Sequence, residues 1–286
     1  MTELLPYLLS VEARNDRLAA VARDPVRFAH RYADPLDQEI AALIAAVYAS
    51  GRVTLFGAVL ERLFAAFDTR GGPAAFVTGY RADRDRAVLA CAAYRFYKPS
   101  DLALLVQGLQ QTLAERPSLS TFFTEPNVAE GLHAMVAALR VAAWSHVDPA
   151  DPPRGFRHLL TSPRDGSACK RLNLFLRWMV RPADGVDLGL WTSLTPADLL
   201  IPLDVHVLRI SRFLGLTRRT DASWRTAVEV TAGLRRLDPA DPVRFDFALS
   251  HLGISGACRG ARYPDPCRLC PLDPVCTAEE GRAEAP

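Results

Sequence analysis

Four of the six cysteines lie within nineteen residues of one another late in the chain. They are Cys258, Cys267, Cys270 and Cys276, with the spacing C-x8-C-x2-C-x5-C. Thiolates are the usual protein ligands of zinc and of iron–sulfur clusters, so a metal centre is the chemistry that this segment indicates. The remaining two, Cys91 and Cys169, lie far away in the sequence.

The spacing favours an iron–sulfur cluster over zinc. Structural zinc sites of the ribbon type usually carry two separate C-x2-C pairs, whereas only Cys267 and Cys270 form such a pair here. One short loop that wraps four thiolates around a single object suits a [4Fe–4S] cluster, which takes four cysteine ligands. Zinc in place of the cluster and four buried thiols without any ligand are the alternatives.

This arrangement resembles the cluster loop of endonuclease III-like DNA glycosylases, which belong to the helix-hairpin-helix superfamily. Those enzymes show C-x6-C-x2-C-x5-C, so this chain has two more residues in the first interval and keeps the other two intervals. The resemblance implies that the four cysteines bind a [4Fe–4S] cluster. It also implies that the loop after Cys258, which carries Arg259 and Arg262, touches DNA phosphate.

A second segment, Leu203-Asp204-Val205-His206, is similar to a V-D-T-H segment that opens a helix in the same superfamily. The aspartate of that segment lies near the sugar of the flipped nucleotide, so the resemblance implies that Asp204 is the catalytic carboxylate. By residue type alone, Asp204 is also explained as the N-cap of the following helix. The two interpretations are compatible, because an N-cap position fixes the carboxylate in place.

The third segment, Gly166-Ser167-Ala168-Cys169-Lys170, resembles the hairpin L-P-G-V-G-R-K-T-A-N of endonuclease III. The alignment places Lys170 on the nucleophilic lysine and Asn173 close to the asparagine of that hairpin. Two departures are visible. Ala168 replaces a hairpin glycine, and 34 residues separate Lys170 from Asp204, which is longer than in endonuclease III. The extra residues, 181–200, are expected to pack on the helical barrel as an insertion.

These residue types suit the cleavage of an N-glycosidic bond. The reaction passes through an oxocarbenium-like sugar, which a carboxylate such as Asp204 stabilises. A bifunctional glycosylase also attacks the sugar carbon with a neutral amine and forms a Schiff base that permits strand cleavage, and the resemblance implies that Lys170 supplies this amine. The positive end of a helix that opens at Lys170 disfavours an extra proton there. Lys98 is the alternative nucleophile in a chain with few lysines, and a Lys170 that only contacts phosphate is the competing interpretation.

Basic residues are concentrated in two segments, although the formal net charge is only +2. From Arg154 to Arg181, seven Lys and Arg residues stand against one acid, and residues 205–219 hold four arginines and no acid. Such asymmetry suits a surface that binds a polyanion, although a solvated arginine-rich surface explains it equally well. The expected contacts with double-stranded DNA are Arg164, Gly166, Ser167, Arg171, Arg259 and Arg262.

The elements that must position these residues are helices. Apolar residues recur at three- and four-residue spacing in segments such as 51–67, and no alternating strand or Gly-rich phosphate loop is present. We therefore expect an all-α, two-lobed glycosylase fold. A helical barrel spans 35–202, with its hairpin at about 156–181, and residues 1–34 plus 203–286 form the iron–sulfur cluster domain. The active site is expected in the cleft between the lobes.

Length and composition fit this expectation. The 286 residues can bury a large core, and 49% hydrophobic with 23% charged residues is ordinary for a soluble globular protein. No run of about 18 uncharged apolar residues occurs, and the acidic N-terminus does not look like a signal peptide. We expect a cytoplasmic monomer at the nucleoid without a membrane partner. In such a reducing compartment a cysteine cluster is more often metal-binding than disulfide-bonded.

Two longer runs, GSACKRLNLFLRWMVR and DPVRFDFALSHLG, together resemble a bacterial family of unknown function that is related to these glycosylases. The likeness spans most of the chain and supports the fold more strongly than any substrate. The function that the resemblances imply is excision of a damaged, oxidised base from DNA, with AP lyase activity. A monofunctional glycosylase and a non-enzymatic iron–sulfur protein that binds DNA or RNA are the alternatives.

Overall fold

The structure is a computed structural model that describes the chain apart from residues 1, 15, 17–18, 20, 145–152 and 282–286. Within the described residues the regular secondary structure is helical, with only isolated bridges between extended residues. The predicted all-α class is therefore confirmed. The α-helices are α1 (Leu5–Arg14), α3 (Pro35–Tyr48), α4 (Val53–Asp68), α5 (Pro73–Thr78), α6 (Ala82–Asp85), α7 (Pro99–Glu115), α8 (Val128–Trp144), α9 (Arg154–Leu159), α10 (Lys170–Val180), α11 (Val205–Phe213), α12 (Trp224–Arg235), α13 (Asp246–Ile254) and α14 (Pro264–Arg268). The 3-10 helices are η1 (Thr2–Leu4), η2 (Pro25–Arg31), η3 (Arg86–Ala92), η4 (Leu119–Phe122), η5 (Pro163–Asp165), η6 (Pro196–Asp198) and η7 (Asp273–Val275).

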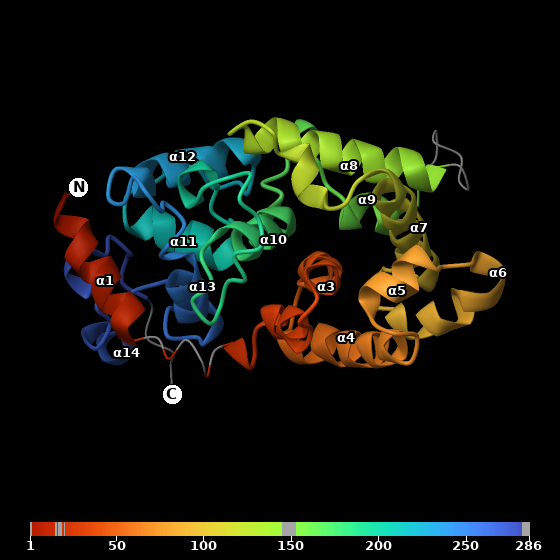
Figure 1. Ribbon diagram of the computed structural model, residues 1–286. Coiled ribbons are helices and arrows are strands. Elements are labelled where there is room, and N and C mark those ends of the chain that lie inside the picture. The colour runs from red at the N-terminus through yellow and green to blue at the C-terminus, as the bar shows by residue number, and fades with distance from the viewer. Residues whose placement is uncertain (1, 15, 17–18, 20, 145–152, 282–286) are drawn as a thin grey trace.

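The helices form two groups, with α10 between them (Figure 1). Helices α1 and α11 to α14 lie together on one side, and α3 to α9 lie on the other. On the first side α13 packs against both α1 and α11, so segments from the two ends of the chain meet there. On the other side α7 packs against α8. Because α10 packs against α3, it joins the two groups.

Helix α3 is the centre of the larger group. Its side chains from Ile40 to Tyr48 are all buried, since this stretch is apolar on every side. The helix begins sharply, because Asp34 accepts hydrogen bonds from the N–H groups of Leu36 at 2.9 Å and Asp37 at 3.1 Å. Pro35 occupies the first helical position, where a missing N–H costs nothing.

The segment that connects α9 to α10, residues 160–169, contains two left-handed residues. Gly166 has φ 75°, and Cys169, immediately before α10, has φ 47°. A non-glycine residue in this region costs roughly 1–2 kcal/mol, and the buried Cys169 thiol donates to the carbonyl of Thr161 at 3.4 Å. Two backbone hydrogen bonds, of 3.3 and 3.1 Å, pair residues 166–168 with residues 222–224, where α12 begins. This connecting segment, where the hairpin was expected, is thus fixed to residues that lie more than fifty positions later in the chain.

The insertion segment, residues 181–200, packs on α10 and α3 as expected. Backbone N–H groups of Leu188 and Trp191 donate to carbonyls in the last turn of α10, both at 2.8 Å. The indole N–H of Trp191 donates to the buried carboxylate of Glu39 at 2.7 Å. The insertion therefore fixes the C-terminal end of α10 against the core.

Candidate functional site

A cleft of about 1720 Å³ is lined by residues from both groups of helices. Among the helices that begin at this cleft, four place a lysine or an aspartate at the first helical position or the N-cap. Lys170 is the first residue of α10, Asp246 is the first residue of α13, Asp204 is the N-cap of α11, and Asp24 is the N-cap of η2. Each helix start carries a partial positive charge. One lysine and three carboxylates therefore meet in a single cleft.

The predicted nucleophile, Lys170, is half-buried and lines the cleft. It forms no hydrogen bond or ion pair with the described part of the chain. Lys98, the alternative, is exposed before α7 and does not line the cleft. Asn173 is buried, and its side-chain amide donates to the carbonyl of Ala168 at 2.9 Å, which ties α10 to the hairpin.

Asp204 lines the same cleft. Its Oδ1 accepts hydrogen bonds from the N–H groups of His206 at 2.9 Å and Val207 at 2.8 Å, which confirms the N-cap interpretation. Oδ2 accepts no hydrogen bond from the residues that the structure describes. The helix thus orients the carboxylate through one oxygen and leaves the other for a ligand.

Asp246, which was not among the predicted site residues, is only 2% exposed. Its Oδ2 pairs with the Arg177 guanidinium at 3.1 Å, and its buried Oδ1 has no hydrogen-bond partner among the described residues. Burial raises the pKa of Asp246 to about 7. The Arg177 and Lys170 cations oppose this rise, and the Asp204 carboxylate adds to it. Asp246 is therefore electrostatically coupled to both predicted catalytic side chains.

Asp24 was missed as well. Burial raises its pKa, and the hydrogen bond from the Val26 N–H and the charges of His251, Arg177 and Lys170 oppose this rise. A repeated pentapeptide in the sequence could have drawn attention to both residues. The sequence DPVRF occurs at 24–28 and again at 241–245, next to Asp246. Each copy folds into the same turn, in which the arginine N–H donates to the aspartate carbonyl. The first copy begins with Asp24, and the second is followed directly by Asp246.

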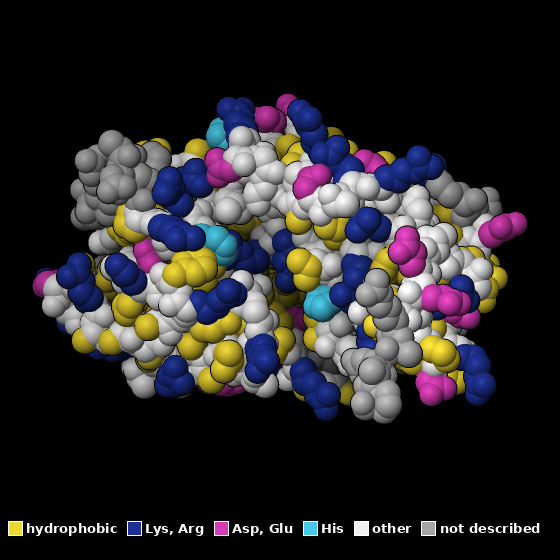
Figure 2. All heavy atoms as spheres, turned by 180° about the vertical axis from the view of Figure 1, so that it is seen from behind, with side chains coloured by type: hydrophobic (Ala, Val, Ile, Leu, Met, Phe, Trp, Pro, Cys, Tyr) yellow, Lys and Arg dark blue, Asp and Glu magenta, His cyan; other side chains and the backbone are white. Residues whose placement is uncertain are grey.

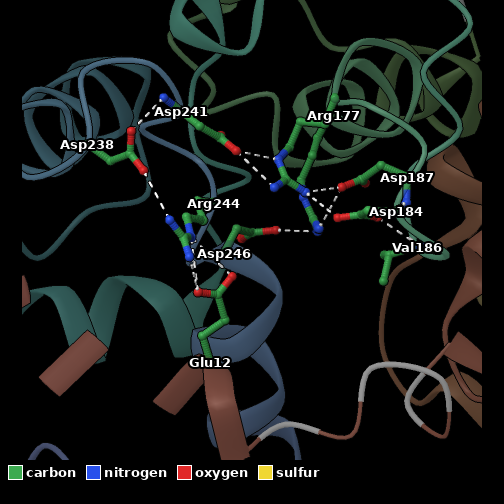
Figure 3. Close-up of polar contacts among 10 residues, drawn as sticks. Glu12, Arg177, Asp184, Val186, Asp187, Asp238, Asp241, Arg244 and Asp246 are labelled. Atoms are coloured by element: carbon green, nitrogen blue, oxygen red, sulfur yellow. Dashed lines mark hydrogen bonds and ion pairs between the residues drawn. The ribbon is translucent and has the colours of Figure 1, made fainter. Parts of the chain in front are cut away.

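A buried network of charges holds Asp246 in place (Figure 3). Arg177, 1% exposed, pairs with Asp246 and also with Asp187 of the insertion segment at 3.1 Å. Asp187 pairs in turn with Arg181, which reaches Asp241 at 2.8 Å. Burial raises the pKa of Asp187 although Arg177 and Arg181 oppose the rise. The insertion thus supplies a counter-charge that keeps Arg177 directed at the cleft.

Of the predicted DNA contacts on the hairpin side, Arg164 is exposed and pairs with the exposed Glu130 at 2.9 Å. Gly166 faces open space, and Ser167 lines the cleft. Basic side chains, dark blue in Figure 2, lie along the middle of the rear face, and few acidic ones are visible there. The hairpin is thus accessible to a polyanion.

Arg171 differs from the expectation, because its guanidinium is buried. It donates to the carbonyl of Val47 at 2.7 Å and makes shorter hydrogen bonds to the Tyr97 hydroxyl and the His158 carbonyl. Three internal acceptors use its N–H groups, so Arg171 does not supply a phosphate contact. The distribution of charges along the sequence could not predict this burial, because the three acceptors come from separate segments of the chain.

The two predicted contacts in the cysteine segment also differ from each other. Arg259 is exposed, whereas Arg262 pairs with Asp273 at 2.8 Å. The segment itself is tied to α11. Arg209 donates to the carbonyl of Cys258 at 2.7 Å, and both the N–H and the hydroxyl of Thr277 donate to the carbonyl of Phe213 at 2.9 Å.

The four clustered cysteines are partly exposed and free of disulfides. Burial raises the pKa of Cys270, and the charges of the other three thiols raise it further, so all four lie near one another. The sulfur of Cys267 accepts the N–H of Tyr263 at 3.3 Å. In the described parts of the chain no three His, Cys, Asp or Glu side chains stand at metal-ligating positions. Four neighbouring thiols on one loop are nevertheless the donor set that a [4Fe–4S] cluster takes.

No described helix has the length and apolar character that crossing a membrane requires. No curated protein and no solved structure matches the chain. A family model described as "Protein of unknown function (DUF2400)" matches residues 24–255. The match includes the cleft residues Asp24, Lys170, Asp204 and Asp246 and ends before the first clustered cysteine. Because it covers more than half of the 286 residues, the chain belongs to this family.

Proposed function

We propose that this protein is a DNA glycosylase of the helix-hairpin-helix type that excises a damaged, oxidised base and cleaves the strand through a Schiff base. The observation that carries the proposal is that one cleft holds two side chains, Lys170 and Asp204. The Lys170 side chain makes no hydrogen bond or ion pair with the described residues, and Oδ2 of Asp204 accepts no hydrogen bond from them. Base excision with strand cleavage requires this combination of an amine and a carboxylate.

Asp204 stabilises the positive charge that develops on the sugar as the N-glycosidic bond breaks. Two backbone N–H groups hold its Oδ1, so the carboxylate needs no reorientation when that charge appears. Asp246 lies within the same electrostatic environment with a pKa of about 7. It is therefore partly protonated at neutral pH, which limits the negative charge around Asp204.

Lys170 performs the covalent step. Its amine lone pair forms a bond to the sugar carbon while the base leaves with the electron pair of the N-glycosidic bond and takes up a proton. Opening of the sugar ring and loss of the amine protons give the Schiff base, from which the strand is cleaved. The amine must be neutral to attack, and as the first residue of α10 it lines the cleft that also holds Asp204.

The remaining expected parts of the enzyme are consistent with this function. Cys258, Cys267, Cys270 and Cys276 would hold a [4Fe–4S] cluster, which would cross-link the loop. The loop would then present the exposed Arg259 to duplex DNA, as the hairpin presents Arg164 and the amides of Gly166 and Ser167.

Borohydride trapping on duplexes that each carry one oxidised base tests the proposal. Reduction freezes the Schiff base, so the wild-type protein should become covalently attached to at least one duplex. Lys170→Arg keeps the charge but cannot form the imine, and it should bind DNA without being trapped. The matched control is Lys98→Arg, which changes the only other lysine, outside the cleft, and should be trapped like the wild type.

The other outcomes discriminate between the alternatives. Trapping that persists in Lys170→Arg and disappears in Lys98→Arg moves the nucleophile to Lys98. Excision by the wild type without trapping identifies a monofunctional glycosylase in which Lys170 contacts phosphate. Binding without excision of any base leaves a non-enzymatic nucleic-acid-binding protein.

A further inference from the structure

The buried Arg171 begins a chain of hydrogen bonds that ends in the cleft. One of its N–H groups donates to the hydroxyl of Tyr97, which is 3% exposed. The same hydroxyl lies 2.6 Å from Nδ1 of His158. His158 is half-buried on α9 and lines the cleft. The three residues thus connect the interior to a ring at the cleft wall.

The direction of these hydrogen bonds fixes the protonation of His158. A guanidinium only donates, so the Tyr97 oxygen accepts from Arg171 and the Tyr97 proton needs another acceptor. Burial raises the pKa of Tyr97, so the phenol keeps that proton at neutral pH. Among the described residues the acceptor is Nδ1 of His158. Nδ1 therefore carries no proton, and the neutral ring carries its hydrogen on Nε2.

Two further observations agree with a neutral ring of fixed orientation. Burial, together with the Arg171, Arg95 and Arg154 cations, lowers the pKa of His158 to about 4. The edge of the ring meets Phe96 at a centroid distance of 4.8 Å and an interplanar angle of 88°. Nε2 makes no hydrogen bond with the described residues. His158 in the cleft lining is thus an uncharged ring of fixed orientation that carries its hydrogen on Nε2.

We propose that His158 determines specificity by donating its Nε2–H to a hydrogen-bond acceptor on the bound base, such as a carbonyl oxygen, and that Tyr97 and Arg171 position it for this. The inference rests on the proposed glycosylase function, because it assumes a base in the cleft. An N–H donor favours a base with a carbonyl and disfavours one with an amino group at the same ring position, since two donors would then face each other unpaired.

The protonation of His158 is tested without any substrate. In a ¹⁵N NMR spectrum of the histidine rings, the wild type should show Nε2 protonated and Nδ1 unprotonated, with no titration between pH 5 and 8. Tyr97→Phe removes the hydroxyl that fixes Nδ1, so the ring should sample both tautomers. Tyr94→Phe is the matched control, because the Tyr94 hydroxyl donates to the carbonyl of Ser50 at 2.6 Å. A wild-type ring with a proton on Nδ1 would overturn the inference.

The ligand is tested by affinity for duplexes with 5-hydroxyuracil or 5-hydroxycytosine, which differ by a carbonyl or an amino group at one position, and with hypoxanthine or adenine. The wild type should prefer the carbonyl member of at least one pair by about tenfold or more. His158→Phe should lose this preference, and His158→Gln, which retains an N–H donor, should keep it. His30→Phe, which changes an exposed histidine outside the cleft lining, should behave like the wild type.

The NMR and binding experiments distinguish a failure of the role proposed for His158 from a failure of the proposed function. A wild type without preference in either pair, or a preference that survives in His158→Phe, overturns the role of His158 even if bases are excised. A wild type that binds no duplex of the panel overturns the proposed function and with it the ligand, while the NMR spectrum independently decides the tautomer. Circular dichroism melting of each variant identifies any loss of binding that comes from unfolding.

Discussion

At the scale of single residues, Asp204 combines two functions that one substitution can separate. An asparagine still accepts the N–H groups of His206 and Val207 through its amide oxygen, but it carries no negative charge. We expect Asp204→Asn to fold and bind DNA normally and to lose base excision by at least 100-fold, a typical loss for one preorganised electrostatic contact. Single-turnover excision and thermal melting measure the two effects.

The chain contains a matched control for this substitution. Asp34 caps α3 through the same pattern of two N–H groups on Oδ1 but does not line the cleft. Asp34→Asn should therefore leave excision unchanged. If Asp204→Asn keeps full activity per folded molecule, the carboxylate is only a helix cap.

Asp246 gives a prediction about the pH dependence of stability. Its pKa rises from 3.8 to about 7 in the folded protein. Between these values the folded state holds a proton that the unfolded state has released, so the free energy of unfolding falls by about 1.4 kcal/mol per pH unit as pH rises. Asp246→Asn cannot titrate and lacks this contribution. In urea unfolding, the variant should gain stability relative to the wild type from pH 5 to 7, and the gain should level off above pH 7.

A difference between variant and wild type that does not change with pH would contradict the raised pKa. The charge of Arg177 already contributes to the pKa of about 7. Replacing the buried carboxyl also changes the packing around Arg177, which adds an offset that does not depend on pH. The test is therefore the rise in relative stability from pH 5 to 7 and not its sign at any single pH.

At the scale of secondary-structure elements, the sequence predicted the helices well. Apolar periodicity is a local property, so it predicted helices such as α4, and the residue types predicted that helices start at Lys170 and after Asp204. The hairpin was less predictable. Its second left-handed residue is Cys169, not the Ala168 that aligns with a glycine, because tertiary contacts hold Cys169 in that conformation.

The parts of the site that were missed depend on contacts between distant segments. In the sequence, Asp246 looks like an ordinary acidic residue at a helix start. Its role depends on the contact with Arg177, which lies 69 residues earlier in the chain. In the sequence, Arg171 looks like a surface cation. In the folded protein its guanidinium is buried and donates to groups of Val47, Tyr97 and His158. Burial of a charged side chain depends on partners that sequence spacing does not reveal.

For the cysteine loop, residues 258–276, we predict the metal content. Anaerobically purified protein should be brown and contain about four iron atoms per chain, the content of one [4Fe–4S] cluster. Cys267→Ser should lower the iron content, whereas Cys91→Ser, which changes a cysteine outside the loop, should not. Colourless protein with one zinc per chain would show that the loop is a zinc site.

At the scale of the whole molecule, the basic surface predicts binding that depends on salt. Each phosphate that a cation neutralises contributes a slope of about −0.9 to the dependence of log K on log salt concentration. Arg164→Ala should weaken binding to every duplex alike and make the slope shallower by about one. Arg171→Ala should instead lower the melting temperature, because it leaves buried acceptors unpaired. Fluorescence anisotropy at several salt concentrations measures the slope, and binding that does not respond to salt would contradict a phosphate interface.

Helix α11, which begins just after Asp204, is held by a segment that the ribosome makes later. Arg209 binds the carbonyl of Cys258, and Thr277 binds the carbonyl of Phe213 at the end of the helix. A growing chain therefore has the complete helix before it has the residues that restrain it. Under the proposed function, a nascent protein would meet DNA while Asp204 is still carried by an unrestrained helix. Excision would begin only when α13 and residues 258–277 have folded back onto α11, so the folding of these later segments would decide when the enzyme becomes active.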